Sequence, residues 1–230
     1  MTMNIAIIPA RGGSKRIPHK NIRDFNGKPI IAYSIEKAIE SKLFDKVVVS
    51  TDSEEIAKVA EDFGAEIPFL RPIELADDFT GINSVISHTL NILDTDGYNF
   101  ACCIFATSPL LVIEDLKESY DLILQNDYKF VFSATEFPHP IERGFKKKDS
   151  GKGLEMLFPD QYMTRSQDLS EWMHDAGQFY WGDISSWLEE AMNFNENSFA
   201  YKLPRWRVQD IDSLDDWKRA ELIFKVLKNY

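Results

Sequence analysis

Cysteine is almost absent from this chain: Cys102 and Cys103 are its two cysteines among 230 residues, and they stand side by side in an apolar run. A disulfide between neighbouring cysteines is strained, so we expect both to be reduced core residues of a cytoplasmic protein. No apolar run approaches about 18 residues, so the sequence predicts neither a transmembrane helix nor a membrane partner. The N-terminal apolar run has too little basic charge before it to indicate a secretory signal.

Basic residues are too few for a nucleic-acid partner. Lys and Arg number 26 against 37 Asp and Glu, giving a net charge of −11, whereas binding a nucleic-acid backbone requires a basic face. A local basic pocket for a small phosphate ligand remains compatible with this balance. The hydrophobic share of 44% and the charged share of 27% are ordinary for a globular protein, and 230 residues suit one domain over 1–230.

Short apolar runs alternate with longer helical patterns through the first 135 residues. We expect strands at 4–9, 46–50, 100–105 and 130–133, and helices at 30–40, 54–63, 81–93 and 113–125. Ser53 is a typical helix N-cap, and Gly64 a typical stop. Strands separated by helices at this spacing predict an α/β fold, with a mainly parallel sheet and helices on both faces.

The pattern changes between about 135 and 175, where prolines, glycines and a lysine cluster interrupt it. We interpret this stretch as an insertion that leaves the sheet to meet a second subunit, with a hairpin over 144–157. A long surface loop is the alternative, but long structureless loops are uncommon in compact domains. Regular structure is expected again as a strand at 177–181, a helix at 185–191 and a C-terminal helix from Ser213.

The loop after the first expected strand carries the strongest chemical signal. It contains Gly12-Gly13, which lets the backbone approach a ligand and present amide groups to an anion. Four cations crowd the same loop and would repel one another without an anion between them: Arg11, Lys15, Arg16 and Lys20. The loop matches neither a Walker motif nor a dinucleotide fingerprint. A bound triphosphate is our interpretation; a solvated basic loop is the alternative.

A second signal lies just before the C-terminal helix. Asp210 and Asp212 alternate along an extended segment, so their side chains point to one side. Two carboxylates together with phosphate oxygens suit Mg²⁺. The alternative is that these charges only complement the dipole of the helix that follows.

Other polar groups are less specific. Thr107 and Ser108 follow the third expected strand, where they would line a base or ribose pocket or simply form a turn. His174 and Gln178, beside the insertion, resemble polar ligand contacts more than core packing.

Several motifs, in order along nearly the whole chain, resemble the cytidylyltransferases that activate nonulosonic acids, the CMP-sialic acid synthetase group. They lie at 8–21 (IPARGGSKRIPHKN), 26–29 (NGKP), 49–52 (VSTD), 71–72 (RP), 107–109 (TSP) and 210–212 (DID). The resemblance implies a Rossmann-like, doubly wound α/β fold and a homodimer with an inserted dimerisation element. It also implies the reaction of CTP with an acid sugar to give a CMP-sugar and diphosphate.

Two stretches of this sequence differ from the sialic acid synthetases and indicate which subgroup of the family it resembles. The chain has FATSP at 105–109 and HDAG at 174–177, where sialic acid synthetases usually carry QPTSP and RPNG. The stretches 165–169 (RSQDL) and 174–181 (HDAGQFYW) instead look like the pseudaminic acid cytidylyltransferases, so the expected acceptor is that nine-carbon acid sugar. The alternatives are N-acetylneuraminic, legionaminic or 3-deoxy-manno-octulosonic acid as acceptor and, more distantly, a non-catalytic nucleotide sensor.

The resemblance also implies roles for individual residues. Asp210 and Asp212 would bind Mg²⁺ or Mn²⁺, and the expected catalytic residues are Lys20, Arg11, Lys15 and Asp212. The expected CTP-binding residues are Ala10, Arg11, Gly12, Gly13, Ser14, Lys15, Asn21, Arg71, Thr107 and Ser108. Arg165 is expected to bind the sugar carboxylate, and the remaining sugar contacts are expected from Gln167, His174 and Gln178.

Overall fold

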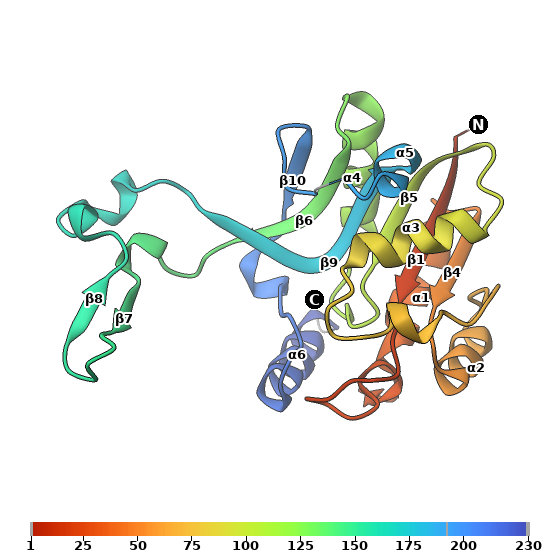
Figure 1. The fold of residues 1–230 in the computed structure, drawn as a ribbon, viewed down its shortest axis with the longest axis horizontal. Coiled ribbons are helices and arrows are strands. Elements are labelled where there is room, and N and C mark those ends of the chain that lie inside the picture. The colour runs from red at the N-terminus through yellow and green to blue at the C-terminus, as the bar shows by residue number, and fades with distance from the viewer. Residues whose placement is uncertain (1, 192, 229–230) are drawn as a thin grey trace.

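A six-stranded sheet forms the centre of the computed structural model, which describes residues 2–191 and 193–228 (Figure 1). The strand order is β10-β6-β9-β5-β1-β4, and β9 runs antiparallel to its neighbours β5 and β6 while the other pairs are parallel. The bounds are Met3–Pro9 (β1), Lys46–Ser50 (β4), Tyr98–Ile104 (β5), Phe130–Glu136 (β6), Met173–Asp183 (β9) and Ser198–Lys202 (β10). The predicted α/β fold with a mainly parallel sheet is therefore confirmed.

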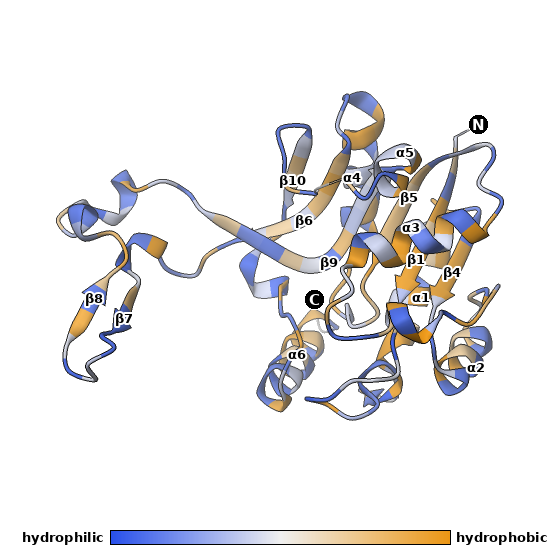
Figure 2. Ribbon diagram, in the orientation of Figure 1, coloured by the Kyte–Doolittle hydropathy of each residue, from blue (hydrophilic) through white to orange (hydrophobic). Residues whose placement is uncertain are grey.

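Helices cover both faces of this sheet because alternate strand residues point to opposite sides. Ile8 of β1 belongs to the core beneath α1 (Ile30–Ser41), α2 (Glu54–Asp62) and α4 (Ile113–Gln125). Ile7 belongs to the core beneath α3 (Ile82–Ile92) and α5 (Ile184–Leu188). A third cluster joins α1 to α6 (Leu214–Leu227). Figure 2 shows the apolar residues concentrated along the central strands.

The serines expected to begin two of the helices form helix caps in the structure. The Ser53 hydroxyl accepts a hydrogen bond from the Ile56 amide at 3.4 Å, which caps α2. Ser213 and Asp216 form a reciprocal capping box at the start of α6. Such caps satisfy backbone groups that the first turn of a helix leaves unpaired. In the described part of the chain, no helix is both long and apolar enough to cross a lipid bilayer.

The edge strand β10 was not predicted. Its sequence is short (SFAYK), and it follows a polar stretch rich in Asn, so neither an apolar run nor a clear alternation announces it. It pairs in parallel with β6 over five residues, and this pairing is a long-range contact. β9 also begins four residues earlier than expected, at Met173.

Between β6 and β9 the chain leaves the sheet and forms an arm, over 137–172, that projects from the body (Figure 1). The hairpin expected within 144–157 is present as β7 (Phe145–Lys147) paired with β8 (Leu154–Met156). The arm exposes large apolar side chains, among them Phe145 (63%), Tyr162 (64%) and Met163 (86%).

The remaining short elements lie in the connections. A two-residue hairpin joins β2 (Asp24–Phe25) to β3 (Lys28–Pro29). Single 3₁₀ turns occur at Lys20–Ile22, Ile73–Leu75, Ile141–Arg143, Pro159–Gln161, Ser166–Asp168 and Arg205–Arg207.

Candidate active site

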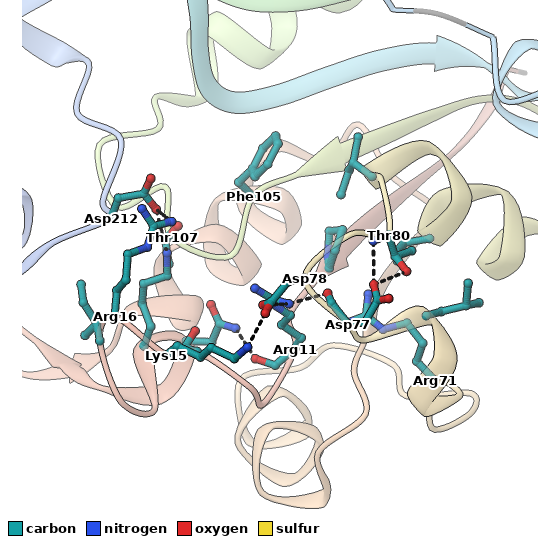
Figure 3. A pocket seen from close by; sticks show the side chains of 18 residues that line it. Arg11, Lys15, Arg16, Arg71, Asp77, Asp78, Thr80, Phe105, Thr107 and Asp212 are labelled. Atoms are coloured by element: carbon teal, nitrogen blue, oxygen red, sulfur yellow. Dashed lines mark hydrogen bonds and ion pairs between the residues drawn. The ribbon is translucent and has the colours of Figure 1, made fainter. Parts of the chain in front are cut away.

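The carboxyl ends of the parallel strands β1 and β5 open onto a cavity of about 340 Å³ (Figure 3). This is the edge at which open α/β sheets bind ligands. Five basic side chains line the cavity: Arg11, Lys15, Arg16, Lys20 and Arg71. Its other polar or aromatic lining residues include Ser14, Asn21, Asp77, Asp78, Thr80, Phe105, Thr107 and Asp212. The basic loop of the sequence thus lines a cavity and is not a dispersed surface feature.

Asp78 balances part of this positive charge from within the chain. Its Oδ1 lies 2.8 Å from Arg11 Nη1, and its other oxygen forms an ion pair with Lys15. The hydrogen bonds from Lys15 and Arg11 lower the pKa of the Asp78 carboxyl. Arg11 also donates to the Asp77 carbonyl. A carboxylate therefore occupies the place between Arg11 and Lys15 that a ligand's anionic group would take.

The two glycines of the basic loop differ in their surroundings. The Gly12 amide donates to Asp52 Oδ1 at 2.9 Å, and a Cβ at Gly12 would lie 3.1 Å from the Ser53 Cβ. Close packing against the start of α2 therefore favours glycine at position 12. A Cβ at Gly13 would meet nothing within 4 Å, so packing does not require glycine there, and neither glycine is among the residues that line the cavity. Ala10 is buried, and its amide donates to the Ser50 carbonyl at 2.9 Å.

Arg71 is a buried cation at the wall of the cavity. The residue is 5% exposed, and its Nη2 lies 4.0 Å from Asp52 Oδ1. Its Nε has no hydrogen-bond partner among the described residues. Burial lowers the pKa of Arg71, while the Asp52 charge opposes that shift. The guanidinium therefore brings a positive charge to the cavity wall, although its unpaired Nε–H is itself buried.

The acidic segment before α6 reaches the same cavity. Lys20 Nζ donates to the Ile211 carbonyl at 2.8 Å and lies 3.7 Å from Asp212 Oδ1. Arg16 Nη2 lies 2.7 Å from the same Asp212 oxygen. Ile211 is fully buried, whereas Asp212 lines the cavity. The apolar residue between the two aspartates therefore fixes which way the segment faces.

A second cavity, of about 720 Å³, adjoins the first through Asp212, which lines both. Asp210 also lines the second cavity, along with His174, Asp175, Arg205 and Trp206. The His174 ring packs edge-on against Phe137, with centroids 4.9 Å apart. Asp212 therefore lies at the junction of a cationic cavity and a mixed polar and aromatic one, with Asp210 beside it on the second.

Asp210 and Asp212 suit a divalent cation. Asp210 is exposed to the cavity, yet the protein around it displaces water and raises its pKa, and the Asp212 charge raises it further. A cation bound between the carboxylates would relieve this repulsion. No cluster of three or more metal-ligating side chains occurs within 2–191 and 193–228, so phosphate oxygens and water would complete the coordination. Mg²⁺ is typically bound this way, by one or two carboxylates with substrate phosphates.

Seven predicted residues are not among those that line these cavities: Ala10, Gly12, Gly13, Ser108, Arg165, Gln167 and Gln178. Arg165 and Gln167 are on the exposed arm, where Arg165 Nε pairs with Asp168 Oδ2 at 2.7 Å. Gln178 is buried, and its Nε2 donates to the Arg207 carbonyl at 3.1 Å. The Ser108 hydroxyl lies 3.3 Å from the Gly177 carbonyl. Within one chain, therefore, His174 lines the second cavity without Arg165, Gln167 or Gln178.

Asn21 and Thr107 lie at the first cavity, as expected, although the Asn21 amide is already used: its Nδ2 donates to the Arg11 carbonyl at 2.9 Å. Sequence reasoning missed Asp77, Asp78, Arg205 and Trp206. For Asp78 a signal existed, because four clustered cations need a counter-charge and an Asp pair follows Arg71 closely in the chain. The other three carry no local signal.

Comparison with known proteins identifies similar chains. Residues 5–156 match the family model described as cytidylyltransferase. Over 225 residues the chain is 47% identical to a pseudaminic acid cytidylyltransferase from Campylobacter jejuni, and the match covers 97% of each. Over 220 residues it is 34% identical to an N-acylneuraminate cytidylyltransferase from Escherichia coli, covering 95% of this chain and 51% of that protein. A solved structure titled CMP:2-keto-3-deoxy-manno-octonic acid synthetase complexed with CTP shares the fold, with a TM-score of 0.73 at 14% identity, covering 98% of this chain and all of that one.

Proposed function

This chain belongs to the cytidylyltransferase family, and from that premise we propose that it transfers CMP from CTP to pseudaminic acid, with release of diphosphate. The observation that carries the proposal is the pair of adjoining cavities. Five basic side chains line the first, polar and aromatic side chains line the second, and Asp212 lines both. CTP would occupy the first cavity and the acid sugar the second. The reacting atoms would then meet beside Asp210 and Asp212.

In this mechanism the anomeric hydroxyl of the sugar attacks the α-phosphorus of CTP, and diphosphate leaves. Arg11 and Lys15 would bind the β- and γ-phosphates after Asp78 releases them. Lys20 would lie nearer the α-phosphate, where negative charge develops, and Arg71 near the cytosine. Catalysis is then mostly positioning and charge neutralisation. Asp210 and Asp212 would hold a Mg²⁺ or Mn²⁺ ion, which supplies further neutralisation of the phosphate charge.

The choice of pseudaminic acid is supported by the chain's similarity over its whole length. Three relatives named for that sugar are 47%, 46% and 39% identical and match 97%, 97% and 90% of this chain, whereas those named for N-acylneuraminate reach 34% at most among the similar proteins compared. His174 and Asp175 line the proposed sugar cavity, and they belong to the stretch in which this sequence departs from the sialic acid pattern. We place the reaction in the cytoplasm.

The direct test measures diphosphate release from CTP and Mg²⁺ with four acid sugars in parallel: pseudaminic, legionaminic, N-acetylneuraminic and 3-deoxy-manno-octulosonic acid. We expect rapid release with pseudaminic acid and at least about tenfold slower release with the others, since mismatched polar groups in a sugar pocket cost more than about 1.4 kcal/mol. Faster release with another acid would overturn the sugar assignment. Thermal stabilisation by CTP with no release in any reaction would favour a nucleotide sensor.

We also propose that two copies pair through the arm and that each arm carries Arg165 and Gln167 to the partner's sugar cavity. The arm exposes apolar side chains that a second copy would cover, and neither residue reaches His174 within its own chain. An exposed guanidinium on such an arm would match the sugar carboxylate bidentately.

Mixed dimers test this arrangement. Arg165→Ala and Asp212→Asn chains, each inactive alone, are unfolded together and refolded as a mixture. If Arg165 acts on the partner's site, each mixed dimer has one intact site, and about a quarter of the wild-type diphosphate release returns. If Arg165 acts within its own chain, every site contains one defect and no activity returns. Phe145→Glu, in the exposed hairpin, should lower the mass measured by sedimentation to that of one chain.

A further inference from the structure

The segment that carries Asp210 and Asp212 has little regular structure of its own. After the 3₁₀ turn Arg205–Arg207 it continues without helix or strand until α6 begins at Leu214. The position of the two carboxylates therefore depends on side chains that hold this segment from outside. At its far end, Lys20 holds the Ile211 carbonyl and the Ile211 side chain is buried in the third core cluster.

At its near end, the segment is held by a two-point ion pair between Arg207 and Asp115. Arg207 Nη1 lies 2.6 Å from Asp115 Oδ2, and Nη2 lies 3.1 Å from Oδ1. The side chains are 13% and 7% exposed. Gln178 adds a hydrogen bond to the Arg207 carbonyl at 3.1 Å. Both the backbone and the side chain of Arg207 are thus fixed, three residues before Asp210.

Asp115 belongs to the folded body of the protein and can therefore hold this segment in place. It lies in the first turn of α4, which follows closely on the turn containing Thr107 and Ser108. The Tyr201 hydroxyl of β10 lies 3.4 Å from Asp115 Oδ1. A planar guanidinium bound at two points has little freedom to move, which a single-point contact would not achieve.

We propose that Asp115 is a positioning residue: through Arg207 it sets where Asp210 and Asp212 stand, and so how tightly the site binds a divalent cation together with CTP. This inference rests on the proposed function, because that function assigns the cation to these carboxylates. Residues that orient metal ligands from behind typically contribute 10–100-fold to metal affinity. A residue that served only the stability of the fold would change the melting temperature without changing that affinity.

The test uses Asp115→Asn and Arg207→Lys, with Asp183→Asn as the matched control. Asp183, like Asp115, lies at a helix start and pairs with a basic residue, Lys129 at 3.3 Å, although it is less buried than Asp115; it lines neither cavity. Mn²⁺ serves as the probe, and its binding to each full-length protein with CTP is followed by electron paramagnetic resonance as the change relative to the same Mn²⁺ and CTP without protein, because CTP alone also binds Mn²⁺. CTP binding without metal is measured by calorimetry.

For Asp115→Asn we expect the Mn²⁺ dissociation constant to rise about tenfold or more, with CTP binding in the absence of metal nearly unchanged. Arg207→Lys keeps the charge but loses the two-point contact, so it should weaken Mn²⁺ binding by a smaller factor. If Asp115→Asn fails to fold, Mn²⁺ binding by Arg207→Lys tests the inference instead. Asp183→Asn should lower the melting temperature and leave Mn²⁺ binding at the wild-type value.

Unchanged Mn²⁺ binding in folded Asp115→Asn or Arg207→Lys would overturn the inference, as would equal weakening in the Asp183→Asn control. Wild-type Mn²⁺ binding that survives Asp212→Asn would also overturn it, because the cation would then lie elsewhere. The proposed function fails separately: the wild-type protein would then bind Mn²⁺ with CTP but release no diphosphate with any acid sugar.

Discussion

Asp212→Asn is expected to reduce diphosphate release from CTP and pseudaminic acid by at least about a hundredfold, because a metal ligand supplies several kcal/mol of charge stabilisation and about 1.4 kcal/mol corresponds to tenfold in rate. The substitution keeps the shape of the side chain but removes the charge that Arg16 and Lys20 both approach. Initial rates measured across a Mg²⁺ titration check the prediction, and the apparent Mg²⁺ requirement should rise as turnover falls.

Asp215→Asn is the control for this experiment. Asp215 lies three residues further on, in the exposed first turn of α6, and lines neither cavity. It should keep wild-type turnover and Mg²⁺ dependence. Near-normal turnover of Asp212→Asn at limiting Mg²⁺ would show that the metal assignment is wrong.

Lys20→Ala is expected to lower turnover by about a hundredfold while changing the dissociation constant of CTP by no more than about threefold. The reason is that charge near the α-phosphorus develops in the transition state, so a cation placed there stabilises that state more than bound CTP. Lys20 is held in place by the Ile211 carbonyl and is 21% exposed, which limits its freedom before CTP arrives. Single-turnover rates and calorimetric CTP binding measure the two effects separately.

Lys15→Ala provides the contrast, because Lys15 is assigned to the distal phosphates. Its side chain is 78% exposed and pairs with Asp78, not with the acidic segment. We expect it to weaken CTP binding more than it slows the chemical step. A Lys20→Ala effect confined to CTP affinity would make Lys20 a binding residue only.

The features predictable from sequence were those encoded over short distances. Ser53 and Ser213 cap helices through residues three positions away, and the apolar run at 4–9 needs only its own composition to indicate a buried strand. The basic loop could be placed at the cavity because ligand sites in α/β sheets follow the carboxyl ends of strands. Family resemblance then extended these local signals to a reaction.

The features that were missed depend on contacts between distant parts of the chain. Asp78 meets Lys15 across 63 residues, and Asp115 meets Arg207 across 92. β10 becomes a strand because β6 offers it an edge. The grouping of Arg165 with His174 came from the family resemblance and stays a prediction, since within one chain the arm carries Arg165 away from the cavity that His174 lines. In each case local composition leaves open which distant residue will be the partner.

The ion pairs of Asp78 also bear on which nucleotides the cavity accepts. A tethered carboxylate competes with every incoming anion at a high effective concentration, so a ligand gains access to Arg11 and Lys15 only by offering more than one charged group. On the proposed assignment CTP does so with its two distal phosphates, whereas a CMP-sugar has lost both. Asp78 would pair with the two cations again after diphosphate departs, and a CMP-sugar alone would not displace it. The loop would then distinguish nucleotides by how many phosphates they carry.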